Sequence, residues 1–139
     1  MSRFFLDTNV FFDVFQVERP SHRDANALIK HIPKGKVDLV LSSISVMNAL
    51  YSFRKAGHDM KAVLEKMNRL IPLLIIAPVD RGDLLGGINS GWTDLEDAIQ
   101  FHAALTAGGI DAIVSNDKDF KQQDRIPVLT PAQALKRLK

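Results

Sequence analysis

Short apolar runs alternate with segments in which apolar residues recur about every three or four positions. The runs predict buried strands, and the recurring residues predict helices with one apolar face. Strands are expected at residues 3–6, 37–41, 73–77, 112–115 and 127–129. Helices are expected at residues 10–17, 21–31, 43–55, 59–70, 80–88, 93–107 and 131–138. Strands and helices therefore alternate along the whole chain.

The order of these elements predicts their arrangement in space. Strands that are joined through helices by short links form a parallel sheet, with right-handed crossovers that place helices on both faces. We therefore expect an α/β fold with a central parallel sheet of four to five strands. With 139 residues, the chain has the length of a single domain, residues 1–139.

Composition narrows the chemistry and the location that we expect. The sequence has no cysteine, which excludes disulfides, thiolate zinc sites and cysteine nucleophiles and fits a reducing cytoplasm. Met1 leads directly into a strand, so no secretory signal is expected. The longest apolar stretch, residues 70–79, contains two prolines and is too short to cross a membrane. A net charge of +2 permits an anionic partner such as nucleic acid without requiring one.

Acidic residues follow two of the expected strands and begin one helix. Asp7 ends the first strand, and Asp117 lies two residues beyond the fourth. Asp94 and Asp97 share a face in the first turn of a helix. The carboxyl ends of parallel strands form one edge of the sheet, where ligands bind. Clustered carboxylates repel one another unless a cation lies between them. A set of oxygen ligands favours Mg²⁺ or Mn²⁺. These ions can activate water for the hydrolysis of a phosphodiester.

Each of these acids also has a purely structural alternative. Asp7 could cap the helix that follows it. Asp94 could be an ordinary first-turn carboxylate, stabilised by the positive end of the helix dipole. Thr93 and Glu96 have the spacing of a capping box, so Thr93 is expected to cap that helix. Asp119 is expected to be a cap or turn residue. The spacing of the acids leaves both interpretations open.

Four segments carry a resemblance to a known family. They are Asp7-Thr8-Asn9-Val10, the segment at residues 94–100 with residues 103–105 and Gly108, the segment at residues 113–120, and the ending at residues 126–131. In this order they resemble the PIN-domain nucleases, which include VapC-like toxins. The resemblance implies a three-layer α/β/α sandwich whose acidic cluster binds Mg²⁺ or Mn²⁺ and cleaves RNA. Many small bacterial members are toxins, so it also implies a homodimer and an antitoxin partner that covers the cleft.

The resemblance assigns roles to single residues. It implies that the metal-binding acids are Asp7, Asp97 and Asp117, and that the supporting residues are Asn9, Asp94 and Ser115. In the family, a further acid, a glutamate, lies in the helix after the second strand. Asn48 stands at that position here, and an amide carries no charge and is a poor base. Asn48 is therefore expected to position water or metal, with weaker metal binding than a glutamate would give.

Basic and aromatic residues add two further expectations. Lys118 and Lys121 flank the fourth acidic segment, so they are expected to contact phosphates if RNA is the substrate. Phe11, Phe12 and Phe15 cannot all face one core from a single helix, so Phe12 could be exposed on a dimer or antitoxin surface. Its alternative is an ordinary core position.

Three functions remain open on the sequence. The first is a metal-dependent endoribonuclease, and the second is a catalytically weak or inactive scaffold that binds RNA or a protein. The third is a nuclease that acts on DNA. Asn9 argues against a haloacid-dehalogenase-type phosphatase, which needs a second aspartate there, and a receiver domain needs an adjacent acidic pair after the first strand. No glycine-rich phosphate loop follows any strand. His102 is expected to pack rather than to catalyse.

Overall fold

Five parallel strands form the centre of the molecule, which we describe from a computed structural model of residues 1–138. The strands are β1 (Ser2–Leu6), β2 (Val37–Ser42), β3 (Ile75–Ala77), β4 (Ala112–Val114) and β5 (Val128–Leu129). They lie in the order β3-β2-β1-β4-β5, and every neighbouring pair is parallel. The predicted parallel sheet is confirmed, and β1 is its central strand.

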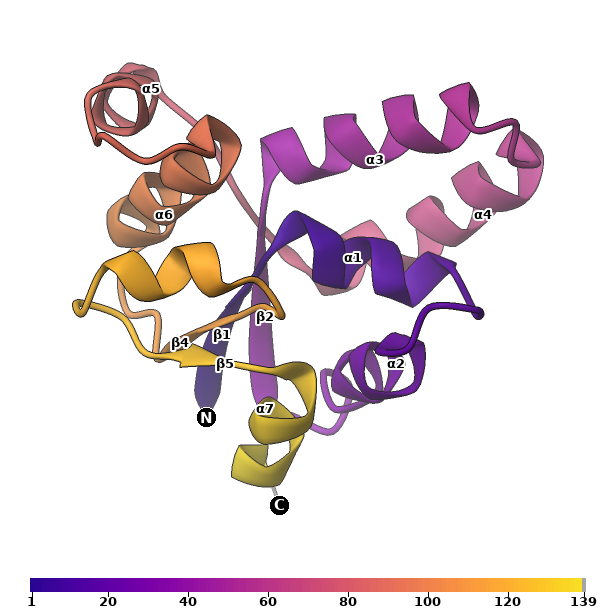
Figure 1. Cartoon of the computed structure of the whole chain (residues 1–139). Helices are drawn as coiled ribbons and strands as arrows, with labels where there is room; N and C mark the ends of the chain where they lie inside the picture. Colours follow the sequence, from indigo (N-terminus) through magenta and orange to yellow (C-terminus); the bar gives the residue numbers. More distant parts are fainter. Residues whose placement is uncertain (139) are drawn as a thin grey trace.

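Helices cover both faces of the sheet (Figure 1). They are α1 (Thr8–Phe15), α2 (His22–Lys30), α3 (Ser43–Lys55), α4 (Met60–Leu70), α5 (Arg81–Ile88), α6 (Leu95–Ala107) and α7 (Pro131–Leu138), with short 3₁₀ helices η1 (Ile71–Leu73) and η2 (Lys118–Gln122). One core cluster joins the sheet to α1, α2, α3, α4 and α7, and a second joins it to α6 and η2. The predicted three-layer α/β/α sandwich is therefore confirmed.

The alternation of side chains along β1 supplies both layers of the core. Phe4 and Leu6 belong to the first core cluster, and Phe5 belongs to the second. All three are at most 1% exposed. Successive side chains of a strand point to opposite faces, so a strand covered on both faces has to be apolar throughout. This burial explains the continuous apolar run before Asp7 and fixes the end of β1 relative to the helices around it.

Element boundaries differ from the predicted ones by a few residues. Helix α1 begins at Thr8, directly after β1, rather than at residue 10. Strand β3 begins only at Ile75, because the chain before it forms η1, which contains Pro72. Ser42, and not Ser43, caps α3: its Oγ accepts the N–H of Ser45 at 3.2 Å. The segments themselves are the predicted ones.

The predicted capping box at the start of α6 is wrong. The cap is Asp94, whose Oδ1 accepts the N–H of Asp97 at 3.1 Å. Glu96 does not reach back to the chain before the helix; its Oε1 instead accepts the hydroxyl of Thr8 on α1 at 3.0 Å. The start of α6 is thereby tied to the start of α1.

Phe12 is half-buried rather than exposed, because its ring packs 5.5 Å from that of Phe53 on α3. Phe12 is therefore less exposed than the partner-surface alternative expected, and it packs against the core while it also lines an opening at the surface. Within residues 1–138, none of the helices combines the length and the apolar character that a membrane span requires.

Candidate functional site

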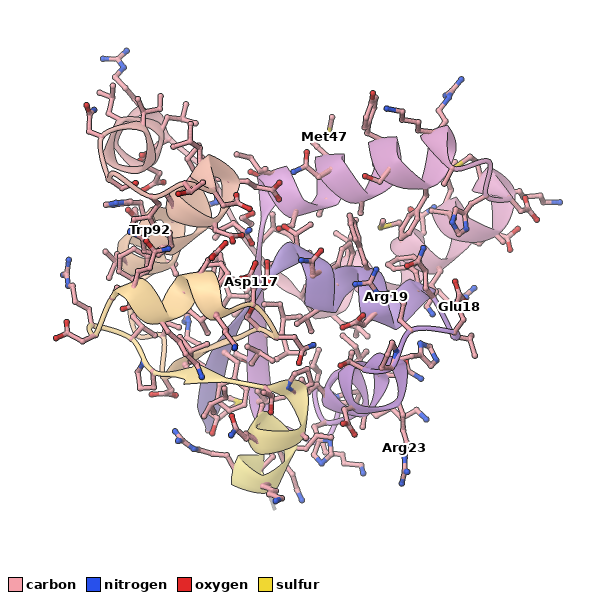
Figure 2. The ribbon with its side chains drawn as sticks, viewed as in Figure 1. Glu18, Arg19, Arg23, Met47, Trp92 and Asp117 are labelled. Carbon is pink, nitrogen blue, oxygen red and sulfur yellow. The ribbon has the colours of Figure 1, made fainter. Side chains whose placement is uncertain are left out.

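The polar residues predicted to carry chemistry lie at the carboxyl edge of the sheet. Asp7 directly follows β1, and Ser115 directly follows β4. Asp97 lies in the first turn of α6. Asp117 precedes η2 and lies near the middle of the view in Figure 2. The parallel sheet brings these groups together because the β1 and β4 strands end side by side.

Asp7 is fixed by side chains from two other elements. It is 1% exposed, and its Oδ2 accepts the hydroxyl of Ser115 at 2.8 Å. Its Oδ1 accepts the side-chain amide of Gln100 at 3.4 Å. Although Asp7 occupies the cap position of α1, the main hydrogen bonds of its carboxylate come from Ser115 and Gln100 rather than from that helix. The alternative that Asp7 merely caps α1 is therefore not what its contacts support.

Gln100 links Asp7 to Asp97. Its Nε2 donates to Asp7 Oδ1 and to Asp97 Oδ1, at 3.4 Å in both cases. Its Oε1 accepts the backbone N–H of Thr8 at 3.2 Å and lies 3.5 Å from the Oγ of Ser45. Gln100 is only 1% exposed, so this amide is a buried connector between α6, α1 and α3.

Asp97 carries an oxygen that the protein leaves unpaired. The residue is 5% exposed, and its Oδ2 is buried without a hydrogen-bond partner among residues 1–138. An unsatisfied buried oxygen is costly, and a buried charge is normally paired or bound to a metal. The second oxygen of Asp97 therefore has the surroundings of a group that lacks its ligand.

Burial and mutual repulsion disturb the titration of both acids. Burial raises the pKa of Asp7 to about 6, although the hydrogen bonds from Ser115 and Gln100 partly oppose this change. Burial, together with the negative charges of Asp7, Asp94 and Asp117, raises the pKa of Asp97 to about 9. Without a cation, Asp97 therefore holds a proton at neutral pH. Perturbed carboxyl groups of this kind gather at functional sites.

More carboxylates surround Asp97. One oxygen each of Asp94, Asp97 and Asp119 lie within 4.8 Å of one another. Asp117 caps η2 through the N–H of Asp119, and its own N–H donates to the Oγ of Ser115 at 2.9 Å. The one ion pair found within residues 1–138 joins Arg19 to Asp13, so no lysine or arginine there neutralises these acids.

A cleft of about 300 Å³ opens beside the acids, and we call it the acidic cleft. Its lining residues are Asp7, Thr8, Asn9, Phe12, Asn48, Ser52, Asp94, Glu96 and Asp97. Asn48 and Ser52 are one turn apart on α3 and bring polar, uncharged groups to this cleft. The structure thus places Asn9, Asn48 and Asp94 beside the acids Asp7 and Asp97.

A second opening leads away from Asp117. Asn9, Arg19, Asn116, Asp117 and Lys118 line it, and a neighbouring opening is lined in part by Lys118, Lys121 and Ser115. Both lysines are exposed. The positive side chains therefore lie on the η2 side of the acids, beside Asp117.

Three residues at or beside these acids were not predicted to belong to the site. Gln100 is one turn beyond Asp97 on the same helix face, which is the signal that could have indicated it. Glu96 was interpreted as part of a capping box, and Asp119 as a cap or turn residue. Their positions depend on how α6 packs against α1 and η2, which sequence spacing does not show. His102 packs against Gly86 of α5, as expected for a structural histidine.

Comparison with known proteins identifies the family. A sequence profile described as PIN domain matches residues 3–119, which is most of the chain. The chain belongs to the PIN domain family. A curated relative, Ribonuclease VapC1 of Aquifex aeolicus (strain VF5), is 30% identical over 138 residues, which cover 96% of this chain and 93% of that protein. The predicted resemblance to PIN domains is therefore confirmed.

Several solved structures share the fold of this chain. VapC20 of Mycobacterium tuberculosis, described as a toxin that cleaves the sarcin–ricin loop, has a TM-score of 0.66 at 18% identity and covers 86% of this chain and 93% of its own. VapBC2 of Rickettsia felis, bound to a DNA fragment from its promoter, has a TM-score of 0.67 at 17% identity, covering 92% and 98%. A toxin–antitoxin complex from Klebsiella pneumoniae has a TM-score of 0.62 at 20% identity, covering 91% and 96%.

Proposed function

We propose that this PIN domain is a divalent-metal-dependent endoribonuclease that hydrolyses RNA phosphodiester bonds, and that it acts as the toxin of a toxin–antitoxin pair. The observation that carries this proposal is the unpaired, buried Oδ2 of Asp97 among acids that no basic residue within residues 1–138 neutralises. The relative named as a ribonuclease supports it, because the match spans nearly all of both chains.

The donor set fits a hard divalent cation. Asp7, Asp97 and Asp117 would hold Mg²⁺ or Mn²⁺, because carboxylate oxygens are the ligands that these ions favour. Asp94 and Asn9 would support them from the lining of the acidic cleft. When bound, the ion would stabilise negative charge on the phosphate and lower the pKa of water.

The remaining residues hold these ligands in place. Ser115 and Gln100 donate to the two oxygens of Asp7, so the carboxylate cannot turn away from Asp97. Outer hydrogen bonds of this kind set the orientation of metal ligands. Asn48, which also lines the acidic cleft, offers an amide that can orient water or substrate but cannot accept a proton at neutral pH.

The substrate backbone would run past η2. Lys118 and Lys121 are exposed beside Asp117, and Arg19 lines the adjoining opening. Cationic side chains attract nucleic acid mainly through its phosphates, and this attraction weakens as salt rises. Lys118 and Lys121 would therefore add affinity for RNA rather than sequence preference.

Cleavage of RNA by the purified protein tests the enzyme. Mg²⁺ or Mn²⁺ should support cleavage, chelation should stop it, and Asp7→Asn and Asp97→Asn should lower the rate by at least a hundredfold. Asp38→Asn is the matched control, because Asp38 on β2 lies beside Arg3 of β1 in the sheet register, near the opposite end of the strands. Equal cleavage by Asp97→Asn and the unaltered protein would contradict the proposal. A single-stranded DNA of the same sequence separates a ribonuclease from a deoxyribonuclease.

Asn48 favours a second candidate, a scaffold that binds RNA without cutting it. The amide removes one negative charge and one potential base from the acidic cleft. A scaffold would bind labelled RNA with an affinity that falls with salt, yet would show no cleavage at any divalent ion concentration. Single-turnover assays with a large excess of protein decide between the two, because they reveal even a slow nuclease.

The same proposal includes an antitoxin partner and a homodimer. Apolar side chains lie exposed on α3 and at the start of α6, which line the acidic cleft, and on α5, which packs against α6: Met47, Tyr51, Leu84, Leu85, Ile88 and Leu95. Figure 2 shows Met47 pointing outward from α3. Contiguous exposed apolar groups are typical of protein-binding surfaces. Light scattering of the purified protein tests the homodimer, and co-purification with the product of a neighbouring small gene tests the antitoxin.

A further inference from the structure

Glu96 brings a carboxylate to the acidic cleft from a helix that already contributes two. It lies between Asp94 and Asp97 in the first turn of α6 and lines the same opening as Asn48 of α3. A first-turn glutamate normally serves the helix dipole or a cap and faces solvent. Asp94 already provides the cap here, so capping does not explain the position of Glu96.

A row of hydroxyl groups fixes the Glu96 carboxylate. Thr8 Oγ1 donates to Glu96 Oε1 at 3.0 Å, and Ser45 Oγ lies 2.6 Å from Thr8 Oγ1. Because the single hydroxyl proton of Thr8 is used toward Glu96, Ser45 has to donate to Thr8. Ser42 Oγ, 3.1 Å from Ser45 Oγ, can donate next in the row. All hydroxyls then point toward Glu96, which is the arrangement that an ionised carboxylate favours.

The row of hydroxyl groups also places Glu96 near α3, the helix on which Asn48 stands in place of a glutamate. Ser45 is in the first turn of α3, and Asn48 is three residues further along the same helix. Glu96 is therefore separated from α3 by one hydroxyl group, that of Thr8. Thr8 donates to only one oxygen of Glu96. The two oxygens of a carboxylate can together accept about four hydrogen bonds or metal contacts. Glu96 thus retains capacity for a cation in the acidic cleft.

We propose that Glu96 supplies the carboxylate that Asn48 lacks. The acidic cleft then keeps its negative charge, and the residue that carries this charge is on α6 instead of α3. The second observation that points to a ligand is the buried Oδ2 of Asp97, the next residue, which lines the same cleft without a partner. The proposal rests on the proposed function, because it concerns the same divalent cation. Glu96 acts on this cation directly or through water, while Thr8 is its positioning residue.

Mn²⁺ binding to the purified protein, measured by isothermal titration calorimetry, tests this role without measuring cleavage. Glu96→Gln removes the charge but keeps an oxygen that can accept the Thr8 hydroxyl, so a merely structural role would survive this change. We expect Glu96→Gln to weaken Mn²⁺ binding by at least roughly tenfold, the size seen when groups around a metal are lost. Glu65→Gln on α4, where Glu65 is exposed, is the matched control and should bind as the unaltered protein does.

A charge-relocation variant completes the experiment. Glu96→Gln combined with Asn48→Glu returns the acid to α3 and should restore Mn²⁺ binding to within about threefold of the unaltered protein, because ligand charge count sets affinity. Circular dichroism melts confirm that each variant folds. Unchanged binding in Glu96→Gln, with loss of binding in Asp97→Asn, would overturn this inference alone. No Mn²⁺ binding by the unaltered protein at millimolar concentration would overturn the proposed function and this inference together.

Discussion

Ser115 and Asp7 are 108 positions apart in the sequence, yet the Ser115 hydroxyl donates to Asp7 Oδ2 at 2.8 Å. The same Oγ accepts the backbone N–H of Asp117 at 2.9 Å. One hydroxyl therefore sets the spacing between the acid after β1 and the acid before η2. Strands β1 and β4, which Asp7 and Ser115 directly follow, are parallel neighbours whose register runs from Phe4 to Leu6 of β1. This pairing keeps the spacing fixed.

Removal of the Ser115 hydroxyl should weaken cation binding without removing a carboxylate. Ser115→Ala leaves the buried Asp7 Oδ2 without its donor, which raises the pKa of Asp7 further and frees its carboxylate to rotate. We expect the affinity for Mn²⁺ to fall roughly 10–100-fold, as for other groups that orient metal ligands. Ser2→Ala, at the opposite end of β1, is the control in the same titration. An unchanged affinity in Ser115→Ala would show that this hydroxyl has no orienting role.

Cation binding should release a proton near neutral pH. Asp97, with its pKa raised to about 9, is protonated before binding, whereas Asp7, with a pKa of about 6, is already ionised. Metal ligands must be deprotonated, so binding Mn²⁺ at about pH 7.5 should eject close to one proton per ion. Calorimetric titrations in buffers of different ionisation enthalpy measure this number. A value near zero would mean that Asp97 is ionised in the free protein or takes no part in binding.

The strands and the acids at their ends could be predicted from the sequence for a simple reason. A strand buried on both faces must be apolar along its length, as β1 is, and a polar residue directly after it must lie at the sheet edge. Asp7 and Asp117 are therefore placed by the order of elements alone. Asp97 follows because a helix start brings the residues of its first turn to one face.

The contacts that connect the acids could not be predicted in this way. Gln100 and Glu96 look like ordinary surface residues of a helix, and only the packing of α6 against α1 gives them Thr8 as a partner. Thr93 and Asp94 are both good capping residues, and local sequence does not decide which one the helix uses. In the structure Asp94 is the cap. The side chain of Glu96 makes no capping contact and lines the acidic cleft.

The cation-free protein should lose stability as pH rises. A carboxyl group whose pKa is higher in the folded than in the unfolded state binds more protons when folded, so the free energy of unfolding falls as pH increases. For Asp7 and Asp97 the fall should begin above their ordinary value of 3.8 and end only above about 9. Thermal melts in the presence of a chelator, from about pH 5 to pH 9, measure it.

Asp97→Asn provides the control for that trend. Asparagine does not titrate, so the decline between about pH 6 and pH 9 should flatten in this variant, whereas Asp38→Asn should keep it. Saturating Mn²⁺ should reverse the trend in the unaltered protein, since an ion that binds only the folded state adds stability. Melting temperatures that rise with pH in the chelated protein would contradict the assignment of a raised pKa to Asp97.

Gly87 on α5 should be intolerant of any side chain. A Cβ at this position would lie 2.4 Å from Ile99 Cγ1 and 2.9 Å from the Ile99 backbone nitrogen on α6. Because backbone atoms cannot move aside as the end of a side chain can, Gly87→Ala should separate α5 from α6. We expect a loss of about 1–3 kcal/mol in the free energy of unfolding, measured by urea denaturation, even though alanine favours helices.

Gly82→Ala on the same helix is the matched substitution. Its Cβ would meet only Asp80 Oδ1, at 3.4 Å, and the residue is exposed, so the helix preference of alanine should stabilise the protein by up to about 1 kcal/mol. Gly87→Ala should also weaken Mn²⁺ binding, because α6 carries Glu96, Asp97 and Gln100 on its first turns. If both variants unfold at the same urea concentration, the close approach of α5 to α6 does not constrain the helix that presents these residues.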